Sequence, residues 1–182
     1  MRLLAVKLLL TLLVAAALAY PLLQPEADAG IFRELEMLGP LAAISLTLLF
    51  LLAVFLYCRD LQCALSLVRP ECRAAAPRSV WLMFLLPYNF IEDFFIVAHV
   101  TQSLRREAQA NDALRPFSHF GMLSGIGWCS AQILSLIPHA IGSLAGLLAL
   151  PLWLAHWHLI RRINRALRAA PPAIVGQGQS QP

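Results

Sequence analysis

Residues 41–57 read LAAISLTLLFLLAVFLY and contain no charged residue. The hydrocarbon core of a bilayer is about 30 Å thick, and an α-helix of about 17–25 apolar residues can cross it. In lipid the backbone polar groups must be hydrogen-bonded within the segment itself, which a helix achieves. This stretch therefore predicts a transmembrane helix and makes the chain an integral membrane protein.

Three further segments predict spanning helices. Residues 3–23 form one apolar run, and no Asp, Glu, Lys or Arg occurs between His119 and Leu159. The second run is long enough for two spans, near 120–137 and 140–160, joined by a turn at Pro138-His139. The whole chain agrees, with 59% hydrophobic residues, 13% charged residues and a mean hydropathy of +0.70. We expect an all-α, polytopic single domain over residues 1–168.

Both ends of the chain need separate interpretation. Arg2 and Lys7 precede the uncharged stretch Leu8–Ala19, and Ala17-Leu18-Ala19 matches an A-x-A cleavage site, so residues 1–19 also resemble a cleavable signal peptide. We favour an uncleaved first helix, and cleavage stays open. The tail at 169–182, rich in Pro, Gly and Gln, is expected to be disordered.

The distribution of basic residues indicates how residues 80–104 relate to the membrane. If this segment does not cross, 13 of the 14 basic residues fall on one side, with the acidic loop at 24–40 on the other. That asymmetry marks the cytoplasmic side and puts the C-terminus there. If all five segments cross, the basic residues split 6 to 8. A third arrangement, in which 80–104 crosses and 119–137 does not, gives 10 to 4 and stays open.

Residues 88–106 predict an amphipathic helix. At about 100° per residue, one side collects polar residues and the other mostly apolar ones. Glu92 and Asp93 at the centre of a span would cancel the insertion energy of its apolar residues, on the order of 5 kcal/mol. We expect a helix that lies in the membrane interface with its polar side in water. The alternative is a fifth spanning helix whose acidic side lines a polar cavity.

A short motif carries a family resemblance. Trp81-x5-Pro87-x-Asn89 precedes the amphipathic helix and is followed by two closing spans. Over residues 80–160 this arrangement resembles some uncharacterised families of small bacterial four-helix membrane proteins. The resemblance implies the same topology and no particular activity.

The polar side of residues 88–106 holds the candidate transport residues. Acids buried in a membrane mark ion or proton paths. The alternative is that they form the wet side of an interfacial helix, paired with nearby arginines. Adjacent carboxylates point about 100° apart on a helix, so Glu92 and Asp93 are not a natural catalytic pair. The residues concerned are Asn89, Glu92, Asp93 and His99.

No cofactor or catalytic centre is predicted. The four cysteines contain no CxxC pair, and neither a nucleophile–His signature nor a phosphate-binding glycine loop occurs. In the expected topology, histidines near the cytoplasmic span ends could ligate haem or a metal, although no spacing is a metal motif. The candidates are His119, His156 and His158.

Two residue patterns predict contacts. Small residues four apart let helices pack closely, within the chain or against a second copy. Arginines beside span ends bind anionic lipid headgroups. The glycines are Gly121, Gly125, Gly142 and Gly146, and the arginines are Arg105, Arg106, Arg161, Arg162, Arg165 and Arg168.

These observations favour a non-catalytic accessory, scaffold or regulatory protein of the bacterial inner membrane. Its expected partners are anionic lipids and another membrane protein or a second copy, and no nucleic acid. Two alternatives remain: a small ion, proton or solute transporter that uses Asn89, Glu92 and Asp93, and a haem- or metal-binding redox protein.

Overall fold

The computed structural model describes residues 2–23, 39–137 and 140–169, and within them every regular element is helical. The five α-helices are α1 (Arg2–Leu23), α3 (Pro40–Leu67), α4 (Asn89–Ala108), α5 (Met122–Leu134) and α6 (Ala140–Ala169). Three 3₁₀-helices lie between them, η1 (Pro70–Cys72), η2 (Pro77–Phe84) and η3 (Asp112–Leu114). The expected all-α fold is confirmed.

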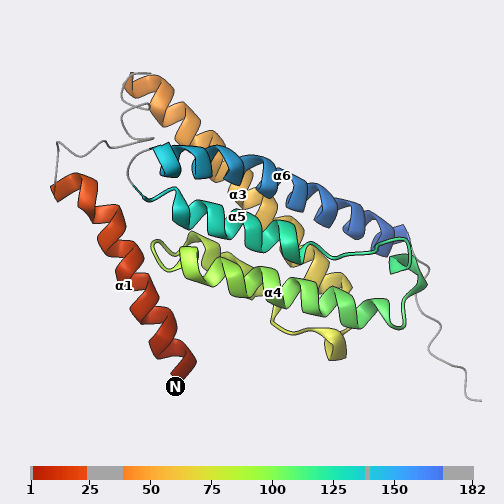
Figure 1. Ribbon diagram of the computed structural model, residues 1–182. Coiled ribbons are helices and arrows are strands. Elements are labelled where there is room, and N and C mark those ends of the chain that lie inside the picture. The colour runs from red at the N-terminus through yellow and green to blue at the C-terminus, as the bar shows by residue number, and fades with distance from the viewer. Residues whose placement is uncertain (1, 24–38, 138–139, 170–182) are drawn as a thin grey trace, which may run out of the picture.

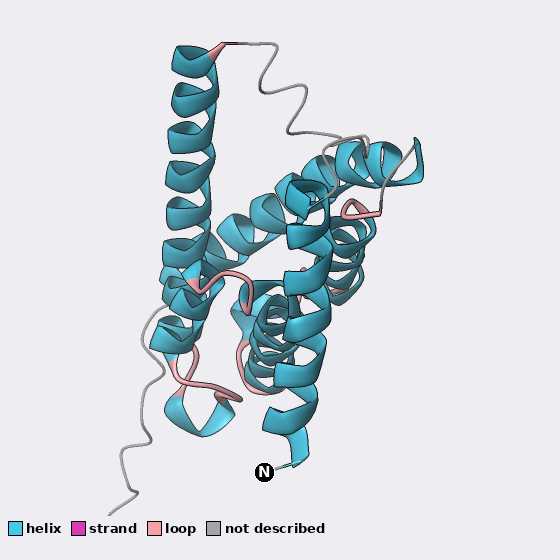
Figure 2. Ribbon diagram, turned by 90° about the vertical axis from the view of Figure 1, so that its left-hand side faces the viewer, coloured by secondary structure: helices cyan, strands magenta, loops and turns pink. Residues whose placement is uncertain are grey.

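Helices α3, α4, α5 and α6 form a bundle, and α1 stands at one end of it against α4 (Figure 1). The main core lies where the C-terminal halves of α3 and α6 meet α4. Figure 2 shows that the N-terminal half of α3 extends beyond the other helices, at the top of the view. The fully buried side chains of this core include Tyr57, Leu61, Val100, Leu104, Ile160 and Ile163.

Three of the four predicted spans coincide with long apolar helices. The spans at 3–23, 41–57 and 140–160 fall on α1, α3 and α6, which are long and apolar enough to cross a membrane. Helices α3 and α6 continue beyond the apolar segments, to Leu67 and Ala169. Charged residues end a span but not a helix, because one side of each extension still packs into the core.

The fourth predicted span is not confirmed. Helix α5 has 13 residues, which makes it about 20 Å long, shorter than the hydrocarbon core. It begins after Gly121, which has a positive φ of 83°, and it ends at Leu134. The apolar residues at 135–137 belong to the connection to α6, so hydropathy alone overestimated the helix.

Residues 69–108 form a hairpin, which we call the α4 hairpin. Its first arm contains η1 and η2, the chain turns at residues 85–88, and its second arm is α4. Near the base of the hairpin, the backbone N–H of Ala74 donates to Ser103 Oγ at 2.9 Å. This hydrogen bond joins the start of the first arm to the last turns of α4. At the tip, Leu85 and Leu86 are 55% and 68% exposed.

The helix predicted at 88–106 is α4. The prediction that its polar side is exposed to water is wrong. Asn89, Glu92, Asp93 and Ser103 on its polar side are buried, and so is Val97 on its apolar side. Helix α4 contacts α1, α3, α5 and η2 and is therefore a central helix of the fold. The amphipathic pattern correctly separated a polar side of the helix from an apolar side. Neighbouring elements cover both sides.

Gly125 allows α4 and α5 to approach closely. A Cβ atom there would overlap Val97 Cγ1, whereas a Cβ at Gly127 would be 3.5 Å from its nearest neighbour, Leu152 Cδ1. We expect Gly125→Ala to destabilise the fold by about 1–3 kcal/mol through overpacking. Gly127→Ala is the matched control and should be neutral or slightly stabilising. Thermal unfolding in detergent measures both, and equal melting temperatures would contradict the close contact.

Candidate functional site

The predicted polar residues Asn89, Glu92 and Asp93 lie together in the first turns of α4, next to the tip of the hairpin. Their exposed fractions are only 7%, 6% and 2%. His99 lies further along α4 and is half-buried. Charged and polar groups so deeply buried need partners, because their desolvation is costly.

Glu92 has a cationic partner from the far N-terminal helix. Lys7 Nζ of α1 lies 2.6 Å from Glu92 Oε2, and the two side chains are 11% and 8% exposed. The ammonium group also lies 3.8 Å from the ring centroid of Phe95, a cation–π contact. From the sequence, Lys7 was interpreted only as one of the basic residues near the N-terminus. A lone lysine six residues into an apolar helix was the available signal for a buried acidic partner.

Apolar contacts complete the junction of α1 with α4. Val14 of α1 packs with Phe90 and Ile91 in a small cluster separate from the main core. The rest of α1 is mostly exposed, with large apolar side chains pointing away from the bundle. The ion pair and this cluster are thus the main attachment of α1.

Asp93 points to a different interface from Glu92. Gly125 of α5 touches Val97 of α4, and one turn along the antiparallel pair places Asp93 beside Cys129. Its carboxylate lies near enough to Tyr57 and Cys129 to act on them electrostatically. Asp93 Oδ1 has no hydrogen-bond partner.

The candidate metal-ligating histidines do not gather. His156 is fully buried, and its Nδ1 lies 3.0 Å from the carbonyl oxygen of Gly121. His119 and His158 are exposed. Within residues 2–23, 39–137 and 140–169, no group of three His, Cys, Asp or Glu residues is close enough to hold a metal ion. His156 instead fills space that Gly121 leaves open, since a Cβ there would be 2.7 Å from the ring.

The four glycines predicted to allow close packing all face neighbouring parts of the same chain. Gly121 and Gly125 contact His156 and Val97, Gly142 abuts the carbonyl oxygen of Ile137, and Gly146 faces Ser135. The two patterns therefore fit packing within the chain, one of the two possibilities that the sequence left open.

The predicted headgroup arginines are all exposed, and several also bind the protein. Arg161 lies 3.6 Å from Asp60 Oδ2, and Arg168 donates to Cys63 Sγ at 2.8 Å. Asp60, which the sequence analysis missed, also accepts a 2.7 Å hydrogen bond from Trp157 Nε1. These contacts join α3 to α6 at the polar end of the bundle.

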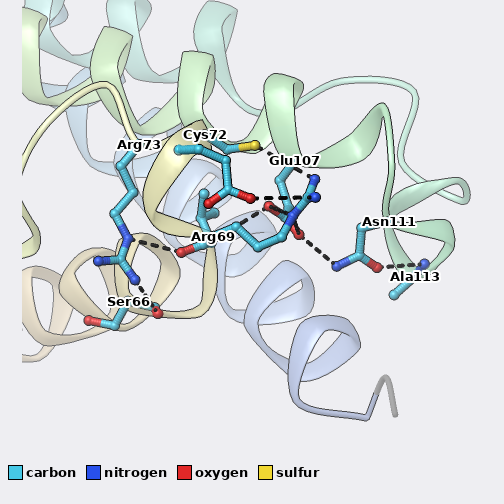
Figure 3. Close-up of polar contacts among 9 residues, drawn as sticks. Ser66, Arg69, Cys72, Arg73, Glu107, Asn111 and Ala113 are labelled. Carbon is cyan, nitrogen blue, oxygen red and sulfur yellow. Dashed lines mark hydrogen bonds and ion pairs between the residues drawn. The ribbon is translucent and has the colours of Figure 1, made fainter. Parts of the chain in front are cut away.

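A second ion pair closes the base of the α4 hairpin (Figure 3). Glu107 accepts hydrogen bonds from the backbone N–H and the guanidinium of Arg69 and from Asn111 Nδ2, at 3.0–3.2 Å. Burial raises the pKa of the Glu107 carboxyl, but these hydrogen bonds outweigh it and leave the pKa below its usual value.

No protein-family model, curated protein or solved structure matches this chain.

The junction of Lys7 and Glu92 predicts a non-additive mutant series. Lys7→Met or Glu92→Met alone leaves one unpaired buried charge and should destabilise by about 3–5 kcal/mol. The double variant removes both charges and should recover most of that loss. Thermal unfolding in detergent by circular dichroism tests this expectation. A double variant as unstable as the sum of the single ones would show that the two charges do not interact.

Glu107 predicts an acid-sensitive contribution to stability. Because its pKa is lower in the folded state, this contribution is present above the unfolded pKa of about 4.3 and disappears as the pH falls through the folded value. We expect Glu107→Gln to cost about 1–3 kcal/mol at pH 7. The difference from wild type should shrink towards pH 3. A difference that is constant from pH 7 to pH 3 would contradict the charged hydrogen bonds of Glu107.

Proposed function

We propose that this protein is a small proton-conducting transporter of the membrane, and that it works through Glu92 and Asp93. The observation that carries the proposal is the buried pair Lys7–Glu92 with Asp93 beside it, next to the tip of a hairpin. Ionisable groups in a membrane interior are rare and usually functional. This was an alternative in the sequence analysis, and it requires these side chains to be buried rather than wet.

The distribution of polar residues supports the placement of this junction inside the membrane. Large apolar side chains are exposed along α1, the N-terminal half of α3 and α6 up to Leu154. The hairpin tip shares this property, with Phe84, Leu85 and Leu86 exposed. The base of the hairpin carries Arg69 and Glu107 and lies with the polar end. The α4 hairpin would thus dip into the membrane and return to the same side.

This arrangement sets the orientation that we propose. Most of the arginines lie at the hairpin base, at the end of α4 and at the end of α6. These parts would therefore lie on the cytoplasmic side of a bacterial inner membrane. Arg105, Arg106 and Arg165 are exposed there. Each would contribute about 1 kcal/mol of attraction to anionic headgroups.

Charge balance at the junction supports a proton as the moving species. Two carboxylates and one lysine leave one negative charge in excess. Lys7 neutralises Glu92 at 2.6 Å, whereas Asp93 is 2% exposed and has an unpartnered oxygen. An unpaired charge in such surroundings is costly, and binding a proton removes it.

Proton flux into liposomes tests this function. Protein reconstituted with a pH-sensitive dye inside and a potassium diffusion potential should acidify the lumen faster than protein-free liposomes do. Asp93→Asn should lower the excess rate at least tenfold, and Glu92→Gln should also lower it. Asp112→Asn is the control, because that side chain is 81% exposed on η3. A wild-type rate equal to that of protein-free liposomes would refute the proposal.

The proposal also predicts that α1 stays attached in the mature protein. Cleavage after Ala19 would remove Lys7 and leave Glu92 unpaired in the junction. Intact-mass measurement of protein purified from membranes should therefore find residues 2–19. A mature chain that begins at Tyr20 would contradict both the ion pair and the transport proposal.

A second candidate function is an accessory protein that binds another membrane protein through α3. Nearly all residues from Pro40 to Leu52 are exposed. The hydroxyl groups of Ser45 and Thr47 donate to their own helix, so this half of α3 presents an apolar surface all round. Photocrosslinking from Leu48 in native membranes should then give one discrete protein adduct. Crosslinking to lipid alone would contradict this function.

A further inference from the structure

Of the six described side chains that have a buried polar atom without a hydrogen-bond partner, three come from three neighbouring helices. They are Tyr57 Oη on α3, Asp93 Oδ1 on α4 and Trp128 Nε1 on α5. Their exposed fractions are 1%, 2% and 7%. Buried polar groups are nearly always hydrogen-bonded, so an unpartnered set indicates a site.

These three groups lie in the same place. The ring centroids of Tyr57 and Trp128 are 6.2 Å apart, and the two rings are nearly perpendicular. Asp93 lies beside Cys129, the residue that follows Trp128, because Val97 touches Gly125 and each of these two residues is one helical turn away. The three side chains thus lie where α3, α4 and α5 pack together.

We propose that Asp93, Tyr57 and Trp128 form a binding site for one proton and its water molecule. This inference rests on the proposed transport function and names the ion. Trp128 can only donate a hydrogen bond, Tyr57 can donate or accept, and Asp93 accepts when ionised. One water oxygen can accept from Trp128 and Tyr57 while its hydrogen reaches Asp93 Oδ1. An N–H group that can only donate repels a bare metal cation, so the site discriminates against Na⁺ and K⁺.

The proton step is balanced. A hydronium ion gives one proton to Asp93 Oδ1, where an O–H bond forms, and the O–H bond that breaks leaves a neutral water molecule. Release is the reverse step, and no oxidant or reductant takes part. In this sequence Tyr57 and Trp128 are positioning residues for the water, and Asp93 holds the proton.

The charges of the groups that surround Asp93 are balanced when the site holds one proton. The neighbouring Glu92 on α4 is neutralised by Lys7 of α1. On the α3 and α5 side, the titratable groups within electrostatic range of Asp93 are Tyr57 and two thiols, and from α6 the His156 ring lies 6.0 Å from the Tyr57 ring. The two thiols are Cys58 and Cys129. No cation among the described residues contacts Asp93 directly, which leaves a proton to neutralise it.

Infrared difference spectroscopy of the full-length protein in detergent tests the site without any measurement of transport. We expect a carbonyl band of a protonated buried carboxylic acid at neutral pH, which shifts in D₂O and is lost in Asp93→Asn. Tyr57→Phe keeps the ring and should shift the band, and Trp128→Phe should do the same. Glu107→Gln is the control and should leave the band unchanged, because Arg69 keeps Glu107 ionised and a carboxylate does not contribute to this band. Sodium or potassium chloride should not displace the band.

The possible results separate the two proposals. A band that depends on Asp93 without proton flux would leave the site standing and refute the transport function. Flux that depends on Asp93 without the band would refute the proton site and keep the transport function. Loss of the band on addition of Na⁺ or K⁺ would show a metal-cation site instead. A band that survives Asp93→Asn would overturn the assignment to Asp93.

Discussion

Lys7 and Glu92 must meet, because neither charge can remain alone among apolar helices. Their contact joins the first described helix to the first turns of α4, 85 residues later in the chain. Removing a buried charge from water costs several kcal/mol, and only a close partner offsets that cost. The position of α1 and the burial of Glu92 both depend on this one pairing.

The bundle divides into two halves that satisfy their polar groups differently. In the apolar half, the exposed large side chains are apolar, and most of them are leucines. In the polar half, Asp60 joins α3 to α6, and Glu107 joins Arg69 to the end of α4. Helices α3 and α6 pass through both halves, so the polar contacts at one end fix the arrangement of the helices at the other. The α4 hairpin is anchored at its base and presents apolar side chains at its tip.

The sequence predicted what depends on composition along the chain and missed what depends on pairing across it. Runs without charge gave α1, α3 and α6, and amphipathic spacing gave α4. The length of α5 was wrong because Gly121 and the turn after Leu134 end the helix within an apolar run. The wet side of α4 was wrong because Lys7, far away in sequence, supplies the partner that water would otherwise provide. Asp60 and Glu107 could not be singled out either, since an isolated acid in a loop or at a helix end has no recognisable pattern.

The spacing of Glu92 and Asp93 explains how one turn of helix serves two purposes. Neighbouring residues on a helix point about 100° apart, so the two carboxyl groups cannot share one partner. Glu92 points to α1 and is held by Lys7. Asp93 points into the bundle towards Tyr57 and Cys129 and keeps an unpartnered oxygen. The first acid therefore attaches α1, and the second acid lies on the α3 and α5 side without a cationic partner among the described residues, which leaves it with the chemistry of a proton site.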